Sequence, residues 1–229
     1  MQNEFTYKPT TALDKIAEVI RKNDLAIIQG GQGAGKTIAI LMLLIDLCNR
    51  QKIEITICSS ELSKLKGTAI NDFVKILKDW NIFKLEHWNK SENIYRFESG
   101  GFIEFIGLDK TDVGKGRRRD FVFINETNKV PLQSFTDITA RAKKVICDFN
   151  PDNHFYLHDL KTENNFISLT YKDNCFLSEK EINNILSYKH RGFFEDGTIK
   201  NNYWANKWRV YGEGVIGSLD GVIFNNWNE

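Results

Sequence analysis

The residues with the clearest chemical purpose form one glycine-rich stretch between a short apolar run and a longer apolar segment. They satisfy the P-loop (Walker A) pattern G-x-x-x-x-G-K-[ST] and read Gly30, Gly31, Gln32, Gly33, Ala34, Gly35, Lys36 and Thr37. The glycines allow successive backbone N–H groups to converge on phosphate oxygens. We expect Lys36 to reach the β- and γ-phosphates and the hydroxyl of Thr37 to bind Mg²⁺. The helix that opens at the loop, beginning around Ile38, adds its positive dipole end, so the sequence predicts binding of ATP with Mg²⁺.

A second set of polar residues follows a buried strand. Phe121–Ile124 is apolar and is followed by Asn125 and Glu126, which resembles a Walker B strand. Ligands in open parallel sheets bind at the carboxyl ends of the strands, so both side chains are expected to face the phosphates. Glu126 is predicted to be the catalytic carboxylate that polarises the attacking water. Asn125 stands where an aspartate normally holds Mg²⁺; its amide oxygen accepts from a metal-bound water but carries no charge, which predicts weaker Mg²⁺ retention.

Asn150 lies just past another predicted strand, Val145–Phe149. We expect it to sense the γ-phosphate or the attacking water. The alternative is an ordinary turn, because Asn-Pro is a common start of a loop. For Asn125 and Glu126 the corresponding alternative is a polar pair at the edge of a strand.

Hydrophobic periodicity indicates the elements that position these groups. Helices are predicted at Thr10–Lys22, Ile38–Cys48, Glu61–Trp80, Ser178–Tyr188 and Ile199–Arg209, and strands at Leu25–Ile28, Ile53–Ile57, Ile94–Glu98, Phe102–Ile106, Phe121–Ile124, Val145–Phe149 and Phe166–Thr170. The pair at Ile94–Glu98 and Phe102–Ile106 reads as a hairpin with a glycine turn. The fold class is α/β: a mostly parallel central sheet flanked by helices, in residues 1–173, followed by a small helical lid in residues 174–229.

Bulk composition limits the function classes. The 229 residues are 41% hydrophobic and 27% charged with a net charge of +1, which predicts an ordinary globular chain without a global case for nucleic-acid binding. No apolar run approaches a membrane span, and the N-terminus lacks the features of a signal peptide. Cys48, Cys58, Cys147 and Cys175 form no CxxC pair and are predicted to be reduced core thiols. His154 and His158 have the spacing of a helical metal pair, but no further ligands lie nearby in sequence, so zinc is disfavoured.

Together, these motifs resemble the ATPase domain of the large terminase subunit of tailed bacteriophages, a DNA-packaging motor. The resemblance is carried by segments 30–37, 115–127, 148–158, 170–178 and 208–224, in that order along nearly the whole chain. It implies a P-loop NTPase of the additional-strand, catalytic-Glu type. It also implies double-stranded DNA, the portal protein and the small terminase subunit as partners, in the host cytoplasm. A homo-oligomeric ring is implied for the assembled state, with a monomer as the alternative for the isolated chain.

The resemblance also implies roles for individual residues. Asp148, Asn150 and Pro151 fall in the segment that couples hydrolysis to movement, and Tyr7 to Pro9 is expected to approach the adenine. Gln32 replaces an arginine that is frequent in related P-loops, so another cation is expected to meet the γ-phosphate, supplied by a neighbouring subunit. The candidates for that cation are Arg117, Arg118, Arg119, Lys64 and Lys66, with a solvated basic loop as the alternative for the arginines.

Other functions remain open at this stage. A helicase or recombinase-type DNA-dependent ATPase fits the same P-loop, and Asn125 favours a nucleotide-gated assembly module with little hydrolysis. A small-molecule kinase is the least favoured. The large subunit also carries a nuclease domain built on clustered acidic residues, and no such cluster follows in this sequence, so DNA cleavage is not expected. Trp204 and Trp208 form an aromatic stripe, expected to pack within the lid, with an interface as the alternative.

Overall fold

One open sheet organises the molecule. The computed structural model describes residues 10–109 and 117–217, and its sheet has eight strands in the order β3-β4-β5-β2-β6-β7-β1-β8. The strands are β1 (Leu25–Gly30), β2 (Glu54–Ser59), β3 (Trp88–Asn89), β4 (Ile94–Arg96), β5 (Phe102–Gly107), β6 (Arg119–Ile124), β7 (Ala142–Phe149) and β8 (Phe166–Leu169). The pairs along the order β5-β2-β6-β7-β1-β8 are all parallel, and the pairs β4-β5 and β3-β4 at one edge are antiparallel.

The position of β7 confirms the predicted fold type. This strand lies between β1, which leads into the P-loop, and β6, which ends at Asn125 and Glu126. It is therefore the additional strand of this class of P-loop fold. The carboxyl ends of β1, β7 and β6 meet at one edge of the sheet, as parallel pairing requires.

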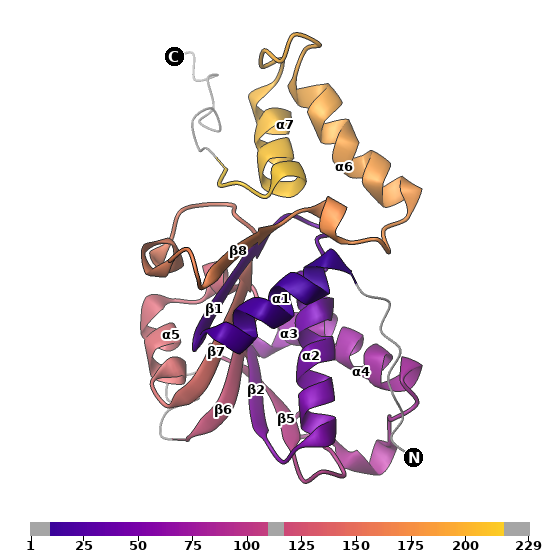
Figure 1. Ribbon diagram of the computed structural model, residues 1–229, viewed down its shortest axis with the longest axis vertical. Coiled ribbons are helices and arrows are strands. Elements are labelled where there is room, and N and C mark those ends of the chain that lie inside the picture. Colours follow the sequence, from indigo (N-terminus) through magenta and orange to yellow (C-terminus); the bar gives the residue numbers. More distant parts are fainter. Residues whose placement is uncertain (1–9, 110–116, 218–229) are drawn as a thin grey trace, which may run out of the picture.

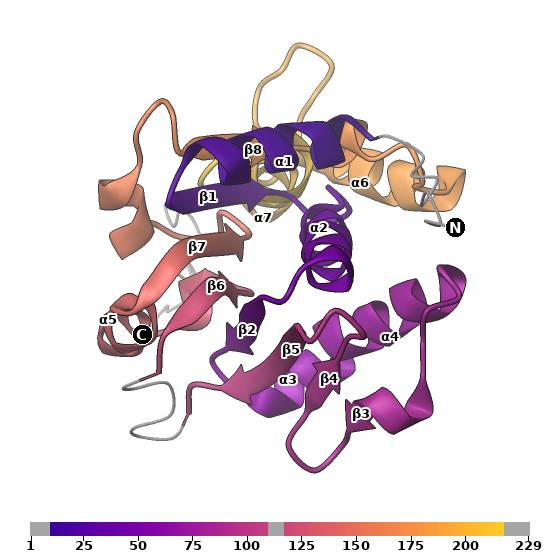
Figure 2. The ribbon, with the colours of Figure 1, turned by 60° about the horizontal axis from the view of Figure 1, so that its bottom comes forward.

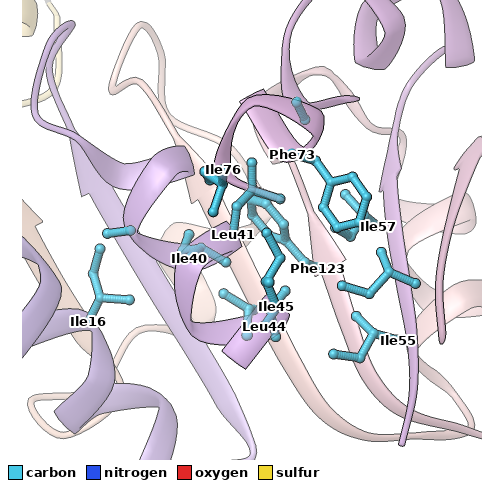
Figure 3. Close-up of a cluster of buried hydrophobic side chains, with 14 of the residues drawn as sticks. Ile16, Ile40, Leu41, Leu44, Ile45, Ile55, Ile57, Phe73, Ile76 and Phe123 are labelled. Atoms are coloured by element: carbon cyan, nitrogen blue, oxygen red, sulfur yellow. The ribbon is translucent and has the colours of Figure 1, made fainter. Parts of the chain in front are cut away.

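Helices cover both faces of the sheet (Figures 1 and 2). Their bounds are α1 (Thr11–Lys22), α2 (Lys36–Arg50), α3 (Leu62–Gly67), α4 (Ala69–Asp79) and α5 (Leu132–Thr139). The larger core lies between the sheet and α1, α2 and α4, where Ile16, Leu44 and Phe73 are fully buried (Figure 3). The smaller core lies on the other face under α5, so the sheet is buried on both sides, as near-continuous apolar strands predict.

The predicted helix over Glu61–Trp80 is wrong as a single helix. The structure has α3 and α4 instead, separated at Thr68, whose φ of −129° and ψ of −93° are not helical. Gly67, the last residue of α3, has poor helix propensity, which favours a break at this point. The hairpin with the glycine turn is confirmed as β4 and β5.

The C-terminal part forms a helical unit above the carboxyl edge of the sheet (Figure 1). It contains α6 (Glu179–Gly192), α7 (Asn202–Lys207) and a π-helical turn over Trp208–Glu213. We call the described segment 174–217 the lid. Ser178 and Glu181 form a capping box at the start of α6, which fixes the beginning of that helix. Trp208 is buried and Trp204 stacks on Tyr188, so the aromatic stripe packs within the lid as expected.

All four cysteines are free thiols. Cys48, Cys58 and Cys147 are buried, and burial raises the pKa of each thiol. Cys175 is exposed, so its predicted place in the core is wrong; it follows Asn174 at the entry to the lid. Among the described residues, no helix has the length and apolar character needed to cross a membrane.

Candidate active site

The P-loop connects β1 to α2 in a backbone shape that depends on its glycines. Gly33 and Gly35 have φ values of 76° and 78°, in the left-handed region that side chains rarely adopt. At Gly31 a Cβ atom would approach the carbonyl oxygen of Tyr211 to 2.2 Å, because the lid lies directly on the loop. Glycines of the motif are therefore needed for two reasons: the turn requires positive φ angles, and the backbone of the lid packs against the loop.

Lys36 is the first residue of α2 and its side chain folds back over the loop. Its Nζ donates to the carbonyl oxygens of Gly30 at 2.7 Å and Gly31 at 3.1 Å, and to Oδ1 of Asn150 at 3.0 Å. Burial lowers the pKa of Lys36, against the opposing effect of the Asp148, Asp152 and Glu126 carboxylates. This contact brings Asn150 beside the P-loop lysine, because β1 and β7 are neighbouring strands.

Asp148, the penultimate residue of β7, is the centre of the polar network. Thr37 Oγ1 donates to its Oδ2 at 2.8 Å, and the Asn125 amide donates to Oδ1 at 3.0 Å and to Oδ2 at 3.2 Å. The residue is only 2% exposed, and burial raises the pKa of its carboxyl group, opposed by the Lys36 ammonium and by hydrogen bonds from Glu126, Thr37 and Asn125. Asp148 therefore links the Walker A hydroxyl to the end of the Walker B strand.

Glu126 occupies an unusual backbone conformation for its residue type. Its φ is 53°, and its backbone N–H donates to Asp148 Oδ1 at 2.9 Å. Backbone strain of this kind persists where the surroundings hold it, and it concentrates at functional sites. The side chain is 43% exposed, with Lys129 Nζ 3.9 Å from its Oε2, so the carboxylate is open to water at the same edge as the P-loop.

A sequence comparison identifies the family of this chain. The sequence profile described as phage terminase large subunit matches residues 22–214. The chain belongs to this family. A search of curated proteins finds no match.

Solved structures give the same fold. The large terminase of a thermophilic bacteriophage aligns with a TM-score of 0.69 and 18% identity, over 92% of this chain and 54% of that protein. The large terminase ATPase domain of Thermus phage P74-26 aligns with a TM-score of 0.60 and 14% identity, covering 92% and 94%. The HK97 large terminase aligns with a TM-score of 0.67 and 13% identity, covering 92% and 51%.

The first and third of these relatives are longer than this terminase chain, which spans about half the length of each. The large terminase of the thermophilic bacteriophage has also been solved with ADP and with ATP-gamma-S.

A cavity of about 410 Å³ opens beside the P-loop of the terminase chain. It lies between the amino ends of α1 and α2, the helix α4 and the entry to the lid. Its apolar lining includes Ile38, Met42, Trp80 and Phe176, with Ile38 and Phe176 exposed. Tyr7 and Pro9, the residues expected near the adenine, lie outside the described residues, but Thr10 lines this cavity.

The candidate trans cations occupy different surroundings. Arg119 is buried, its Nε donating to Thr56 Oγ1 at 2.7 Å and lying 3.7 Å from Glu104 Oε1. Arg117 pairs with Glu104 at 2.9 Å. Arg118 is exposed and makes no hydrogen bond or ion pair with another residue in 10–109 or 117–217; it lines a cavity of about 830 Å³. That cavity also includes Lys52, Arg141 and Lys143, and lies at the amino ends of β2, β6 and β7.

The two lysine candidates lie on α3, after the carboxyl end of β2. Lys64 Nζ is 3.1 Å from Glu61 Oε1 and donates to Ser60 Oγ at 3.0 Å, while Lys66 is exposed. They therefore share an edge of the sheet with the P-loop, whereas the arginines lie at the opposite edge.

The lid contacts the P-loop directly. Asn174 Nδ2 donates to the carbonyl oxygen of Gly33 at 2.8 Å, and Leu177 lies against the same glycine. Just before the loop, in β1, Gln29 Nε2 donates to the carbonyl oxygen of Gly214 at 2.7 Å. Pro151 accepts from Gly217 at 2.9 Å, so the segment after β7 is joined to the end of the lid.

Sequence reasoning missed the contact between Asp148 and Thr37 and the contact between Asn174 and Gly33. The register places Asp148 beside Ile28 and Cys147 beside Ile124, which brings residue 148 next to residue 125. An acidic residue inside the otherwise apolar strand 145–149 was the signal available, but its meaning depends on the strand order. In the described part of the chain, no group of three or more His, Cys, Asp or Glu side chains is arranged to hold a metal; His154 and His158 stack on each other.

Proposed function

We propose that this chain is the motor domain of a large terminase and hydrolyses ATP to drive double-stranded viral DNA into a procapsid. The observation that carries the proposal is the convergence of Lys36, Asn150 and Glu126 at one edge of the sheet, in a chain of this family. The complexes of the thermophilic phage terminase with ADP and ATP-gamma-S support ATP as the ligand. Residues 1–173 form the ATPase core in this proposal and residues 174–229 the lid.

The residues divide the chemistry among them. The backbone of segment 30–35 and the Lys36 ammonium bind the phosphates, and the cavity at Ile38 and Phe176 accepts the base. Glu126 holds and polarises the attacking water, for which its exposed carboxylate is suitably placed. Mg²⁺, when bound, would be held by the hydroxyl of Thr37 and the carboxylate of Asp148, whose oxygens suit that ion, and would supply charge stabilisation for the phosphates.

Coupling to movement follows from the contacts of the P-loop. Asn150 touches Lys36, and Pro151 is hydrogen-bonded to Gly217 in the lid. A change in the phosphates held by Lys36 therefore acts on both Asn150 and the lid segments around Asn174 and Tyr211. DNA is held through its backbone phosphates, so translocation is expected to be steeply salt-dependent.

The test is ATP hydrolysis by purified chain with and without double-stranded DNA. Lys36→Ala is expected to lower turnover at least about 100-fold, because the phosphates lose their main cationic partner. Lys22→Ala, which removes an exposed lysine paired with Glu18 on α1, serves as the matched control and is expected to leave turnover unchanged. Intact turnover in Lys36→Ala would refute the site assignment.

Hydrolysis, ATP binding and strand separation, measured on the same purified chain, distinguish the competing functions. Strand separation or a preference for single-stranded DNA would favour a helicase-type ATPase. Negligible hydrolysis at every protein concentration, with ATP binding retained, would favour a nucleotide-gated assembly module. The motor function predicts stimulation by double-stranded DNA and greater activity of the assembled ring than of a lone subunit.

A further inference from the structure

The acidic residue missing from the end of β6 has a counterpart on the neighbouring strand. Asn125 follows β6, where the Walker B pattern has a carboxylate, and it is neutral. Asp148 lies in β7, within hydrogen-bond distance of the Asn125 amide, and is almost completely buried. An ionised carboxylate in such a place needs partners, and this one has a set of donors aimed at it.

The hydrogen-bond donors to Asp148 belong to the P-loop and to the residues that follow β6. Thr37, the P-loop hydroxyl, is 2.8 Å from Asp148 Oδ2, and the N–H of Glu126 is 2.9 Å from Oδ1. Asn125 Nδ2 lies 3.0 Å from Asp148 Oδ1 and 3.3 Å from Thr37 Oγ1. Asp148 thus makes the contact to the P-loop threonine that the pattern assigns to position 125, and it also fixes the backbone of the catalytic residue.

We propose that Asp148 is the carboxylate of the Mg²⁺ site for the bound nucleotide, and that Asn125 is its neutral hydrogen-bond partner. The inference rests on the proposed function, since the ion arrives with the nucleotide. The donor set fits: Mg²⁺ takes oxygen ligands and is held in nucleotide sites by one or two carboxylates and by phosphates. Thr37 and Asp148 supply a hydroxyl and a carboxylate at the P-loop, so no larger cluster of acidic residues is required.

The carboxylate of Asp148 explains why a neutral amide is favoured at position 125. Two ionised carboxylates at a separation of about 3 Å repel each other, and one of them would take up a proton. The side chain beside the ionised Asp148 has to donate a hydrogen bond to it. Asparagine does so through its Nδ2, whereas an ionised aspartate has no hydrogen to donate. The acid and the amide therefore form one unit shared by two adjacent strands, and exchanging them should preserve the unit.

The exchange can be made and measured by isothermal titration calorimetry. The variants are Asp148→Asn, Asn125→Asp and the double variant, and the measured quantity is the ratio of the ADP dissociation constants in EDTA and in Mg²⁺. Asp148→Asn is expected to reduce this ratio at least about 10- to 100-fold, since even the loss of an outer-shell partner of a metal site lowers metal affinity by that much. The double variant is expected to recover most of it. Asp152→Asn, which removes a nearby carboxylate that has no contact with Thr37, is the matched control and should keep the wild-type ratio.

The outcomes distinguish this inference from the proposed function. A wild-type ratio in Asp148→Asn, or a double variant no better than Asp148→Asn, would overturn the role of Asp148 while nucleotide binding itself stands. Wild-type chain that binds no ADP in either buffer would overturn the proposed function and this inference with it. Affinity in EDTA close to wild type in each variant checks that the site remains folded.

A second measurement needs no substitution. In this experiment Mn²⁺ takes the place of Mg²⁺ in the ADP complex of the wild-type chain. The chain carries ¹³C either at the side-chain carboxylate carbon of aspartate or at the side-chain amide carbon of asparagine. Electron–nuclear double resonance is expected to show coupling of Mn²⁺ to labelled aspartate. Coupling to labelled asparagine alone would refute the proposal.

Discussion

Single polar side chains at the ends of buried strands decide what this site can do. Lys36, Thr37 and Glu126 were predicted from short local patterns, because a P-loop and the residue after a Walker B strand are defined by a few adjacent positions. Asp148 could be assigned only a coupling role, because its contact with Thr37 depends on β7 lying between β1 and β6. Spacing along the chain does not contain that order. The positive φ of Glu126 could not be predicted from the sequence either, since glutamate is not a residue type that indicates this conformation.

Glu126→Gln is expected to bind ATP and hydrolyse it about 10²- to 10⁴-fold more slowly, the range associated with loss of a general base. Glutamine keeps the size of the side chain and the backbone bond to Asp148, so only the carboxylate is lost. Single-turnover hydrolysis and equilibrium ATP binding are the measurements. Lys129→Gln, which removes the cation 3.9 Å from Glu126, is the control and should retain turnover within a few-fold. Near-normal turnover in Glu126→Gln would place the base elsewhere.

At the level of elements, a buried polar cluster joins three parallel strands away from the active edge. Glu104 in β5 accepts from Thr56 in β2 at 2.5 Å, and Arg119 in β6 donates to Thr56. The apolar runs predicted these strands, but not the charged pair inside the sheet, because neither residue interrupts the pattern enough to signal its partner. The break between α3 and α4 was missed for a similar reason: the apolar stripe continues across Thr68 even though the backbone does not.

Glu104→Gln is expected to lower the free energy of unfolding by about 3 kcal/mol, because it removes the buried carboxylate that lies 3.7 Å from the Arg119 guanidinium and 2.9 Å from Arg117. Urea unfolding followed by circular dichroism measures the change. The double variant Glu104→Gln with Arg119→Met should lose less than the sum of the two single losses, since both members of the buried pair are then absent. Lys143→Ala, which breaks the more exposed pair with Asp120, is the control and should cost less than about 1 kcal/mol. Additive losses in the double variant would contradict a coupled pair.

The molecule as a whole separates the P-loop from the arginines at positions 117–119. β6 runs from Arg119 to Ile124, so Arg118 and Glu126 lie at opposite edges of the sheet, on the order of 20 Å apart at the rise of a strand. An arginine there cannot reach the P-loop of its own chain, so the predicted contact with a γ-phosphate requires a neighbouring subunit. Of the three arginines, Arg119 is buried and Arg117 is paired with Glu104, whereas Arg118 is exposed. The sequence pointed to all three, because it could not distinguish structural from accessible guanidinium groups.

Arg118→Ala is therefore expected to abolish the rise of ATPase activity per chain with protein concentration, while ATP binding by each chain is retained. Mixing Arg118→Ala with Glu126→Gln should restore activity, because the first variant supplies an intact catalytic site and the second an intact arginine. In a random equimolar ring about one quarter of the interfaces then combine both native groups, which sets the expected recovery. Lys52→Ala, a neighbouring cation in the same cavity, is the control and should retain the rise. If the mixture stays inactive while each variant still assembles, the cation does not come from Arg118, and Lys64 and Lys66, on the same edge as the P-loop, become the candidates.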